Sequence, residues 1–159
     1  MNNSETTFWK TINTYRIVIP RIQRDYVQGR RTRLVENARD ALLTDIHESC
    51  SSGKPTSLNF VYGKVEGPED DERFLPLDGQ QRLTTVSLLL LALMNLIEDG
   101  IIEHKSASLS SRIREDYLID KWQPEERKIK LKPVKNDMKA FNSLFDPNAD
   151  PVMESNVTQ

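Results

Sequence analysis

Cysteine is almost absent from this chain, since Cys50 is the only one among 159 residues. A single thiol cannot form an internal disulfide, and no zinc-type ligand spacing surrounds it. Histidine is equally scarce. His47 and His104 have no partner of ligand type one helical turn away, so we expect both to be exposed rather than to bind a metal. The sequence therefore gives no sign of a disulfide scaffold or of a Cys/His metal centre.

Long hydrophobic runs are also missing. The longest, 86–97, is interrupted by Ser87 and Asn95 and is shorter than the roughly 18 residues of a membrane-spanning helix. The first residues, Met-Asn-Asn-Ser-Glu, lack the basic-then-apolar order of a secretory signal. With 37% hydrophobic residues and a mean hydropathy of −0.57, we expect a globular cytoplasmic domain that does not bind a membrane.

A strong excess of charge of one sign is absent as well: the net charge is −2, which argues against a surface that binds nucleic acid everywhere. The distribution is uneven, however. Six arginines stand against the single acid Asp25 in one stretch of the chain: Arg16, Arg21, Arg24, Arg30, Arg31 and Arg33. Such a run is either a solvated face or an anion site. Because the planar guanidinium of arginine binds phosphate through two N–H donors, better than the ammonium group of lysine does, an anionic partner is the alternative.

The hydrophobic periodicity alternates between short strands and segregated helices, which indicates an α+β fold. Strands are expected at 15–19, 58–65, 73–77 and 127–132, and helices at 32–52, 80–98, around 109–117, and after a cap at Asn136 or Asp137. Residues 1–145 should form one domain. Residues 146–159, polar with two prolines, should form a tail or linker to a C-terminal region beyond this sequence.

The strongest candidate for chemistry runs from Leu75 to Thr85, where a strand leads through Asp78-Gly79 into the long helix. The first turn of a helix offers unpaired backbone N–H groups and the positive end of the helix dipole. Arg82 in that turn is unfavourable for the helix itself, and a bound phosphate would explain it. The Thr84 and Thr85 hydroxyls lie nearby. Asp78 is a helix cap, a magnesium ligand or a residue that positions water.

A purely structural interpretation of this segment also stands. Asp-Gly is a common turn, aspartate is a favoured cap, and Gln80 and Gln81 can satisfy a helix end without a ligand. The segment is not a Walker A loop, because the glycine spacing and the lysine of that loop are missing.

A second candidate is Ile19–Tyr26, where Pro20 ends a strand. Gln23 is suited to a base or ribose, Arg24 to a phosphate, and Tyr26 to stacking. Alternatively, Arg24 and Asp25 form a surface ion pair and Tyr26 belongs to the core. Polar residues at other element ends could complete a pocket: Lys64, Asn136 and Asp137. We expect the aromatic residues Trp9, Phe60, Phe74 and Trp122 to be core.

Together these two segments resemble a known family. Ile-Pro-x-x-Gln-Arg-x-Tyr at 19–26 (the first motif) and Leu-Asp-Gly-Gln-Gln-Arg-Leu-Thr-Thr at 77–85 (the second motif) are similar to the GmrSD-type N-terminal domain of type IV, modification-dependent restriction enzymes. The resemblance implies a ParB/sulfiredoxin-like fold, a small mixed sheet packed against several helices with a buried central helix that starts near Gly79. One departure is Gln28, where the family commonly has an aromatic residue.

The resemblance implies that the domain binds and hydrolyses a nucleoside triphosphate with Mg²⁺ and so licenses DNA cleavage. The nuclease would be a C-terminal domain or subunit, DNA would be bound through the full-length protein, and the protein could form homo-oligomers. Carried over to this sequence, the catalytic residues are Asp78, Gln81 and Arg82, Asp78 is also the metal ligand, and the nucleotide-binding residues are Gln23, Arg24, Gly79, Gln80, Arg82 and Thr84.

No nuclease activity is expected from this chain alone, because the histidine-containing motif of the family's nuclease half is missing. Two alternatives remain open. In the first, the chain is a non-catalytic module that senses DNA or a nucleotide within a larger nuclease or toxin complex. In the second, it is a structural interaction domain.

Overall fold

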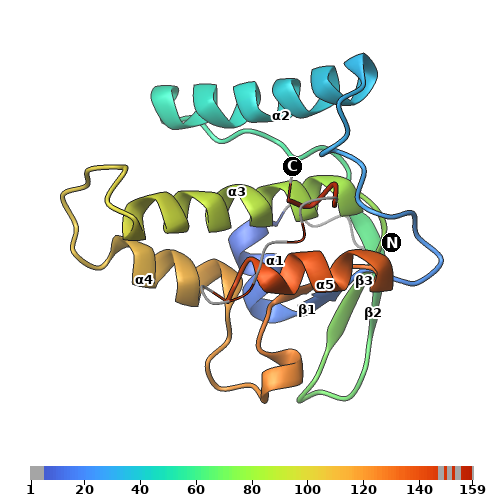
Figure 1. Cartoon of the computed structure of the whole chain (residues 1–159). Coiled ribbons are helices and arrows are strands. Elements are labelled where there is room, and N and C mark those ends of the chain that lie inside the picture. The colour runs from blue at the N-terminus through green and yellow to red at the C-terminus, as the bar shows by residue number, and fades with distance from the viewer. Residues whose placement is uncertain (1–5, 147–148, 150–151, 153–154, 159) are drawn as a thin grey trace.

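The computed structural model describes residues 6–146, 149, 152 and 155–158. Its α-helices are α1 (Phe8–Thr14), α2 (Arg33–Ser52), α3 (Gln80–Glu98), α4 (Leu109–Ile113) and α5 (Lys135–Ser143). A π-helical turn, Arg114–Leu118, follows α4, and a 3-10 turn covers Glu125–Arg127. The strands are β1 (Arg16–Val18), β2 (Tyr62–Glu66), β3 (Arg73–Asp78) and β4 (Leu131–Lys132). The predicted α+β class is confirmed (Figure 1).

The four strands form one mixed sheet in the order β2-β3-β1-β4. β2 and β3 pair antiparallel, as the predicted hairpin requires, whereas β1 runs parallel to both β3 and β4. The carboxyl ends of β1, β3 and β4 therefore meet at one edge of the sheet. From that edge the chain continues into segment 19–31, α3 and α5, respectively. In open sheets with parallel strands, ligands tend to bind outside this edge.

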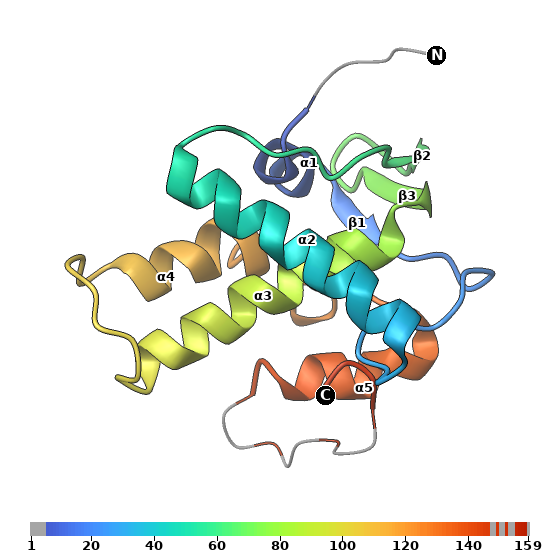
Figure 2. The same cartoon turned by 90° about the horizontal axis from the view of Figure 1, so that it is seen from above.

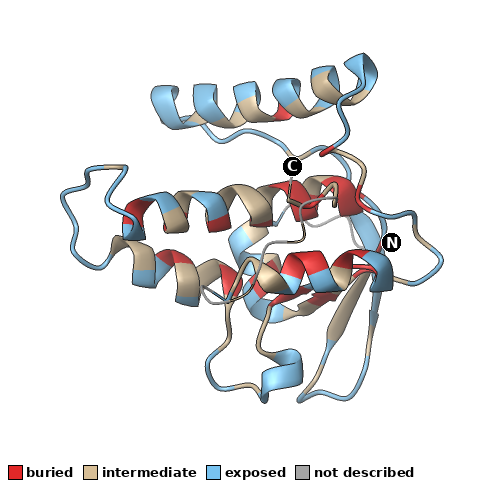
Figure 3. Ribbon diagram, in the orientation of Figure 1, coloured by how far each residue is buried: buried red, intermediate tan, exposed pale blue. Residues whose placement is uncertain are grey.

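The main core lies where α3 and α5 pack on the sheet, and Figure 3 shows the buried residues gathered there. Ile17 is fully buried in β1, Leu83 is 2% exposed in α3, and Phe141 is 1% exposed in α5. Each such side chain contributes about 1.5–3 kcal/mol by leaving water. A second cluster joins the later half of α3 to α4 and the π-helical turn through Leu91 and Leu118.

Helix α3 begins and ends where the sequence predicted, at Gln80 and Glu98. By length and composition alone it could also cross a membrane, a property that core helices of soluble domains share. Half of its most apolar window is buried inside the domain.

Helix α2 lies apart from this core: it lies above α3 in Figure 1 and crosses it obliquely in the view of Figure 2. Its bounds follow the prediction: Thr32 is its N-cap residue, and Gly53, in the left-handed conformation, ends it. Leu42 is its only buried residue, and Leu34 is 82% exposed.

Several local predictions were wrong. Neither Asn136 nor Asp137 caps α5, because Val134 is the N-cap residue and the helix begins at Lys135. Strand β4 keeps only two of the six residues expected, since Arg127 belongs to the 3-10 turn and Ile129 forms only an isolated bridge with Ile119. Helix α1 was not expected. Three aromatic residues expected in the core are largely exposed: Trp9 by 50%, Phe60 by 81% and Trp122 by 86%.

The end of the described chain returns to the core. Val157 is 6% exposed within the main cluster, and Gly29 lies so close to the Asn156 carbonyl that a Cβ there would be 1.7 Å from its oxygen. The domain boundary at residue 145 stays a prediction.

The turn before α3 requires glycine for two reasons. Gly79 has φ +84°, which disfavours any Cβ, and an added Cβ would lie 2.6 Å from Cγ2 of Val61. Gly53 has φ +67° but nothing within 4 Å of its Cβ position. We expect Gly79→Ala to lower the free energy of unfolding by about 3 kcal/mol and Gly53→Ala by about 1 kcal/mol, measured by urea unfolding. Equal losses would show that Val61 does not constrain the turn.

Candidate functional site

Side-chain hydrogen bonds join segment 19–31 to the second motif, which lies more than fifty residues further along the sequence. Gln23 Nε2 donates to the Leu77 carbonyl at 3.1 Å. The backbone N–H of Val27 donates to Gln81 Oε1 at 3.0 Å, and Gln81 Nε2 donates to the Asp25 carbonyl at 3.2 Å. The start of α3 thus holds segment 19–31 by its backbone.

Gln81 is 8% exposed, and its oxygen and nitrogen each have a backbone partner in that segment. The predicted catalytic glutamine is therefore a positioning residue in this structure: it fixes where the side chains of the first motif lie. Its predicted catalytic role would require these bonds to change.

Tyr26 belongs to the core, as the alternative for the first motif had it. It is 7% exposed, and its hydroxyl lies 2.9 Å from Thr85 Oγ1, which also donates to the Gln28 side chain. Burial, the largest effect, raises the Tyr26 pKa above 10.0. The Tyr26 N–H donates to Asp137 Oδ2 at 2.6 Å. Tyr26 thus links segment 19–31 to both α3 and α5 and offers no stacking surface to a ligand.

The remaining residues of the second motif lie at the end of β3 and in the first turns of α3. Asp78 accepts the Gly79 N–H at 2.7 Å and lies 3.9 Å from the Arg82 guanidinium, which donates to the Phe60 carbonyl at 2.5 Å. Thr84 donates to the Gln80 carbonyl at 2.9 Å, so its hydroxyl is already engaged.

Two buried polar atoms of this turn lack a hydrogen-bond partner within the described residues: Gln80 Oε1 and Arg82 Nε. Buried polar atoms without partners are uncommon and call for an explanation.

A cavity of about 610 Å³, which we call the edge cavity, opens at the carboxyl edge of β1 and β4. It is lined by Arg21, Gln23, Arg24, Asp25, Val27, Arg30, Thr32, Val35 and Asn136. Of the predicted nucleotide residues it therefore contains Gln23 and Arg24. Gly79, Gln80, Arg82 and Thr84 do not line it, and the second motif reaches it only from behind, through the bonds to segment 19–31.

The edge cavity is rich in positive charge, because three arginines line it beside a single acid, Asp25. Arg21, Arg24 and Arg30 are exposed, and within the described part of the chain none of their side chains has an ion pair or hydrogen bond. The alternative of an Arg24–Asp25 ion pair is not realised. Thr32 at the start of α2 also lines the cavity without a side-chain capping bond, so the positive end of that helix dipole faces the same region.

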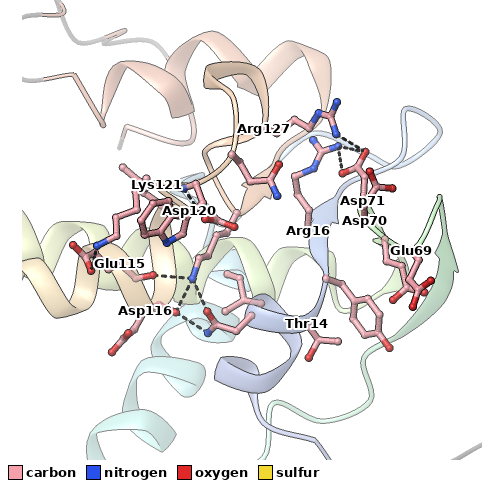
Figure 4. Close-up of a pocket in the computed structure, with 18 residues that line it drawn as sticks. Thr14, Arg16, Glu69, Asp70, Asp71, Glu115, Asp116, Asp120, Lys121 and Arg127 are labelled. Atoms are coloured by element: carbon pink, nitrogen blue, oxygen red, sulfur yellow. Dashed lines mark hydrogen bonds and ion pairs between the residues drawn. The ribbon is translucent and has the colours of Figure 1, made fainter.

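A second cavity, of about 350 Å³, lies at the opposite edge of the sheet (Figure 4). Here the cations are already paired: Asp71 binds Arg16 and Arg127, each at 3.3 Å. Lys130 donates to Asn13 Oδ1 and to the carbonyls of two residues in the π-helical turn. Seven of the lining residues are acidic: Glu69, Asp70, Asp71, Glu72, Glu115, Asp116 and Asp120. This cavity is poorly suited to a polyanion.

The predicted cofactor, Mg²⁺, has few ligands in the chain. Among the described residues there is no group of three His, Cys, Asp or Glu placed to hold a metal ion. Asp78 offers one carboxylate, 60% exposed. Magnesium in nucleotide sites is commonly held by one or two carboxylates together with phosphate oxygens and water. The donors therefore fit magnesium that arrives with a triphosphate, rather than a site built by the protein alone.

Comparison with known proteins identifies the family of this chain. The family model described as "GmrSD restriction endonuclease, N-terminal domain" matches residues 7–157, which is nearly the whole chain. The search of curated proteins found no match to this chain.

The Gln81 amide allows a direct test of its positioning role. Gln81→Leu leaves the Val27 N–H and the Asp25 carbonyl without their partners, so we expect the free energy of unfolding to fall by about 2 kcal/mol. Gln123→Leu is the control, because the Gln123 side chain makes no hydrogen bond within the described residues and should cost less than about 0.5 kcal/mol. Equal stabilities in urea unfolding would contradict this role.

Asp137 gives a pH-dependent prediction. It is 7% exposed, and burial, the largest effect, raises its pKa above 3.8. The stability that it contributes is therefore fully present below pH 3.8 and is lost as the pH rises through the folded-state pKa. Asp137→Asn keeps an acceptor for the Tyr26 N–H without this titration. We expect the stability of the wild type relative to the variant to fall as the pH rises from below 3.8, measured by urea unfolding at several pH values. A difference in stability between wild type and variant that stays constant or rises with pH would contradict the raised pKa of Asp137.

Proposed function

The chain belongs to the GmrSD restriction endonuclease N-terminal domain family, and from that membership together with the edge cavity we propose that it binds and hydrolyses a nucleoside triphosphate. A domain of this family is part of a larger restriction protein with a nuclease part. Nucleotide turnover in this domain would then regulate that nuclease, whose substrate is DNA that carries a modification.

The observation that supports the proposal is the set of three unpaired arginines in the edge cavity. Arg21, Arg24 and Arg30 bring a concentrated positive charge to a protein whose net charge is −2. Guanidinium groups bind phosphate oxygens through two parallel N–H donors. A triphosphate would neutralise the mutual repulsion of these arginines, and the start of α2 would add its dipole.

The cavity also has the size and the place of a ligand site. Its volume, about 610 Å³, lies within the roughly 300–1,000 Å³ of small-molecule pockets. It opens at the carboxyl edge of parallel strands, where connecting segments from several elements converge on one ligand. Figure 1 shows the amino-terminal ends of α2 and α3 on the side where segment 19–31 lies.

In this proposal the first motif binds the nucleotide and the second motif supplies the catalytic residues. The arginines of the edge cavity bind phosphates, and Gln23 contacts the ribose or a phosphate. Two atoms at the start of α3 are still without a hydrogen-bond partner within the described residues: Arg82 Nε and Gln80 Oε1. Neither Arg82 nor Asp78 lines the edge cavity, so their roles require a triphosphate that extends from the cavity to the start of α3. There Arg82 would stabilise charge that develops during phosphoryl transfer, and Asp78 would orient water and bind the magnesium that the triphosphate carries.

A second candidate function is a sensor that binds without turnover. Arg31 and Arg33 are exposed next to the edge cavity but do not line it, which favours an extended anion such as the DNA backbone at this surface. DNA binding would weaken steeply with added salt, because each neutralised phosphate releases counterions.

The test compares the wild type with Arg24→Ala and with Arg112→Ala, a matched control on α4 whose exposed side chain has no partner within the described residues. Nucleotide binding and phosphate release would be measured together, with magnesium and a panel of nucleoside triphosphates. We expect Arg24→Ala to weaken binding about tenfold or more and Arg112→Ala to leave it unchanged.

Phosphate release by the wild type would support the hydrolase, whereas binding without release would support the sensor. Binding that Arg24→Ala does not affect would contradict the assignment to the edge cavity. If no triphosphate binds, the proposed function is wrong.

A further inference from the structure

The edge cavity contains one carboxylate among its arginines. Asp25, which follows β1, accepts the Asn136 side-chain amide from α5: Nδ2 of Asn136 lies 3.1 Å from Oδ1 and 3.3 Å from Oδ2 of Asp25. Both residues are exposed and both line the cavity. The two residues are 111 positions apart in the sequence, and only the tertiary structure brings them together.

A site for phosphate alone gains nothing from this carboxylate, because Asp25 repels an anion and partly cancels the positive potential of the arginines. A carboxylate in such a cavity favours a ligand that is anionic in one part and presents N–H donors in another. A nucleotide is a ligand of this kind, since its triphosphate is anionic and its base carries N–H groups.

Unused hydrogen-bonding capacity remains at this pair. An ionised carboxylate can accept about four hydrogen bonds, and Asp25 accepts those of one nitrogen, Nδ2 of Asn136. Asn136 Oδ1 has no partner within the described residues, and the amide has a second N–H. The pair therefore presents several acceptors and one donor to the cavity.

A structural role explains the pair less well. The adjacent residue already ties segment 19–31 to α5, because the Tyr26 N–H donates to Asp137 at 2.6 Å in a buried position. An exposed bond between Asp25 and Asn136 adds little to that buried one, as exposed polar pairs contribute little to stability.

We propose that Asp25 and Asn136 recognise the base of the nucleotide in the edge cavity and select bases that carry a ring N–H, guanine before uracil, over adenine and cytosine. This inference rests on the proposed nucleotide binding. Guanine presents its ring N–H and its exocyclic amino group side by side, so both oxygens of Asp25 can accept from it. Uracil offers a single ring N–H. Adenine and cytosine present an exocyclic amino group beside a ring nitrogen that is an acceptor, so only one oxygen of Asp25 can accept from them while the other faces a lone pair.

The experiment is equilibrium binding by calorimetry, with magnesium, of GTP, UTP, ATP, CTP, XTP and inorganic tripolyphosphate to the same protein. We expect the wild type to bind GTP about tenfold or more tightly than ATP, the usual size of a bidentate discrimination between bases. Asp25→Asn replaces two acceptors by one acceptor and one donor, the pattern that matches xanthine. This variant should lose its preference for GTP over ATP and gain affinity for XTP.

Two further variants keep the test decisive. Asp45→Asn, on an exposed position of α2 that does not line the cavity, is the matched control for the loss of one negative charge and should retain the wild-type order. Asn136→Ala removes the amide that holds the Asp25 carboxylate but keeps the carboxylate itself, so it should narrow the preference for GTP over ATP without a gain for XTP. A preference that stays at the wild-type value in this variant would contradict the role of Asn136, and this measurement remains if Asp25→Asn fails to fold.

Equal affinities of the wild type for the four common triphosphates would overturn this inference and leave the proposed function standing. An equal loss for every nucleotide in Asp25→Asn, with no gain for XTP, would also overturn it. If neither the nucleotides nor tripolyphosphate bind, the proposed function fails together with the inference.

Discussion

The side-chain amide of Gln81 is the constraint on which the candidate site depends. Its two ends bind the Val27 N–H and the Asp25 carbonyl, so the beginning of α3 determines the course of the segment that follows β1. The bond from Tyr26 to Asp137 fixes the same segment against α5. A stretch without regular secondary structure is thereby held at two adjacent points, and its arginine side chains project from a fixed backbone.

This arrangement accounts for the charge distribution of the chain. At the opposite edge of the sheet, Arg16 and Arg127 are neutralised by Asp71, and the acidic turn between β2 and β3 lies beside them. At the carboxyl edge, the arginines of segment 19–31 have no such partners within the described residues. One arginine-rich stretch of sequence thus contains both a structural ion pair and an unneutralised cluster, and the unneutralised cluster is the one suited to an anionic ligand.

The second motif supports the site more than it lines it. Gln81 is committed to backbone groups, Thr84 bonds to its own helix, and Gly79 permits a close approach to Val61. Arg82 and Gln80 retain atoms without partners, which leaves them able to act on a ligand that reaches the start of α3. The proposed division, in which the first motif binds phosphates and the second positions the first, follows from these contacts.

Much of the fold could be predicted from local patterns. The bounds of α2 and α3 were correct because Gly53 and Gly79 mark helix ends, and the hairpin of β2 and β3 was correct because two apolar runs flank a polar turn. The cap at Asn136 was wrong because Pro133 and Val134 place the helix start earlier.

The core position of Tyr26 could not be distinguished from a stacking role in advance. Its partners, Thr85 and Asp137, are 59 and 111 residues away. Asp25 and Asn136 likewise meet only through tertiary structure, so their pairing had no local signal.

The most direct test of the central claim is to observe the arginine side-chain Nε–H signals by NMR while inorganic tripolyphosphate is added to the domain. The account predicts that the signals of Arg21, Arg24 and Arg30 shift together and saturate, while those of Arg16 and Arg127, already paired with Asp71, stay in place. Shifts confined to Arg16 and Arg127, or no saturable shift at all, would contradict a phosphate site at the carboxyl edge of the sheet.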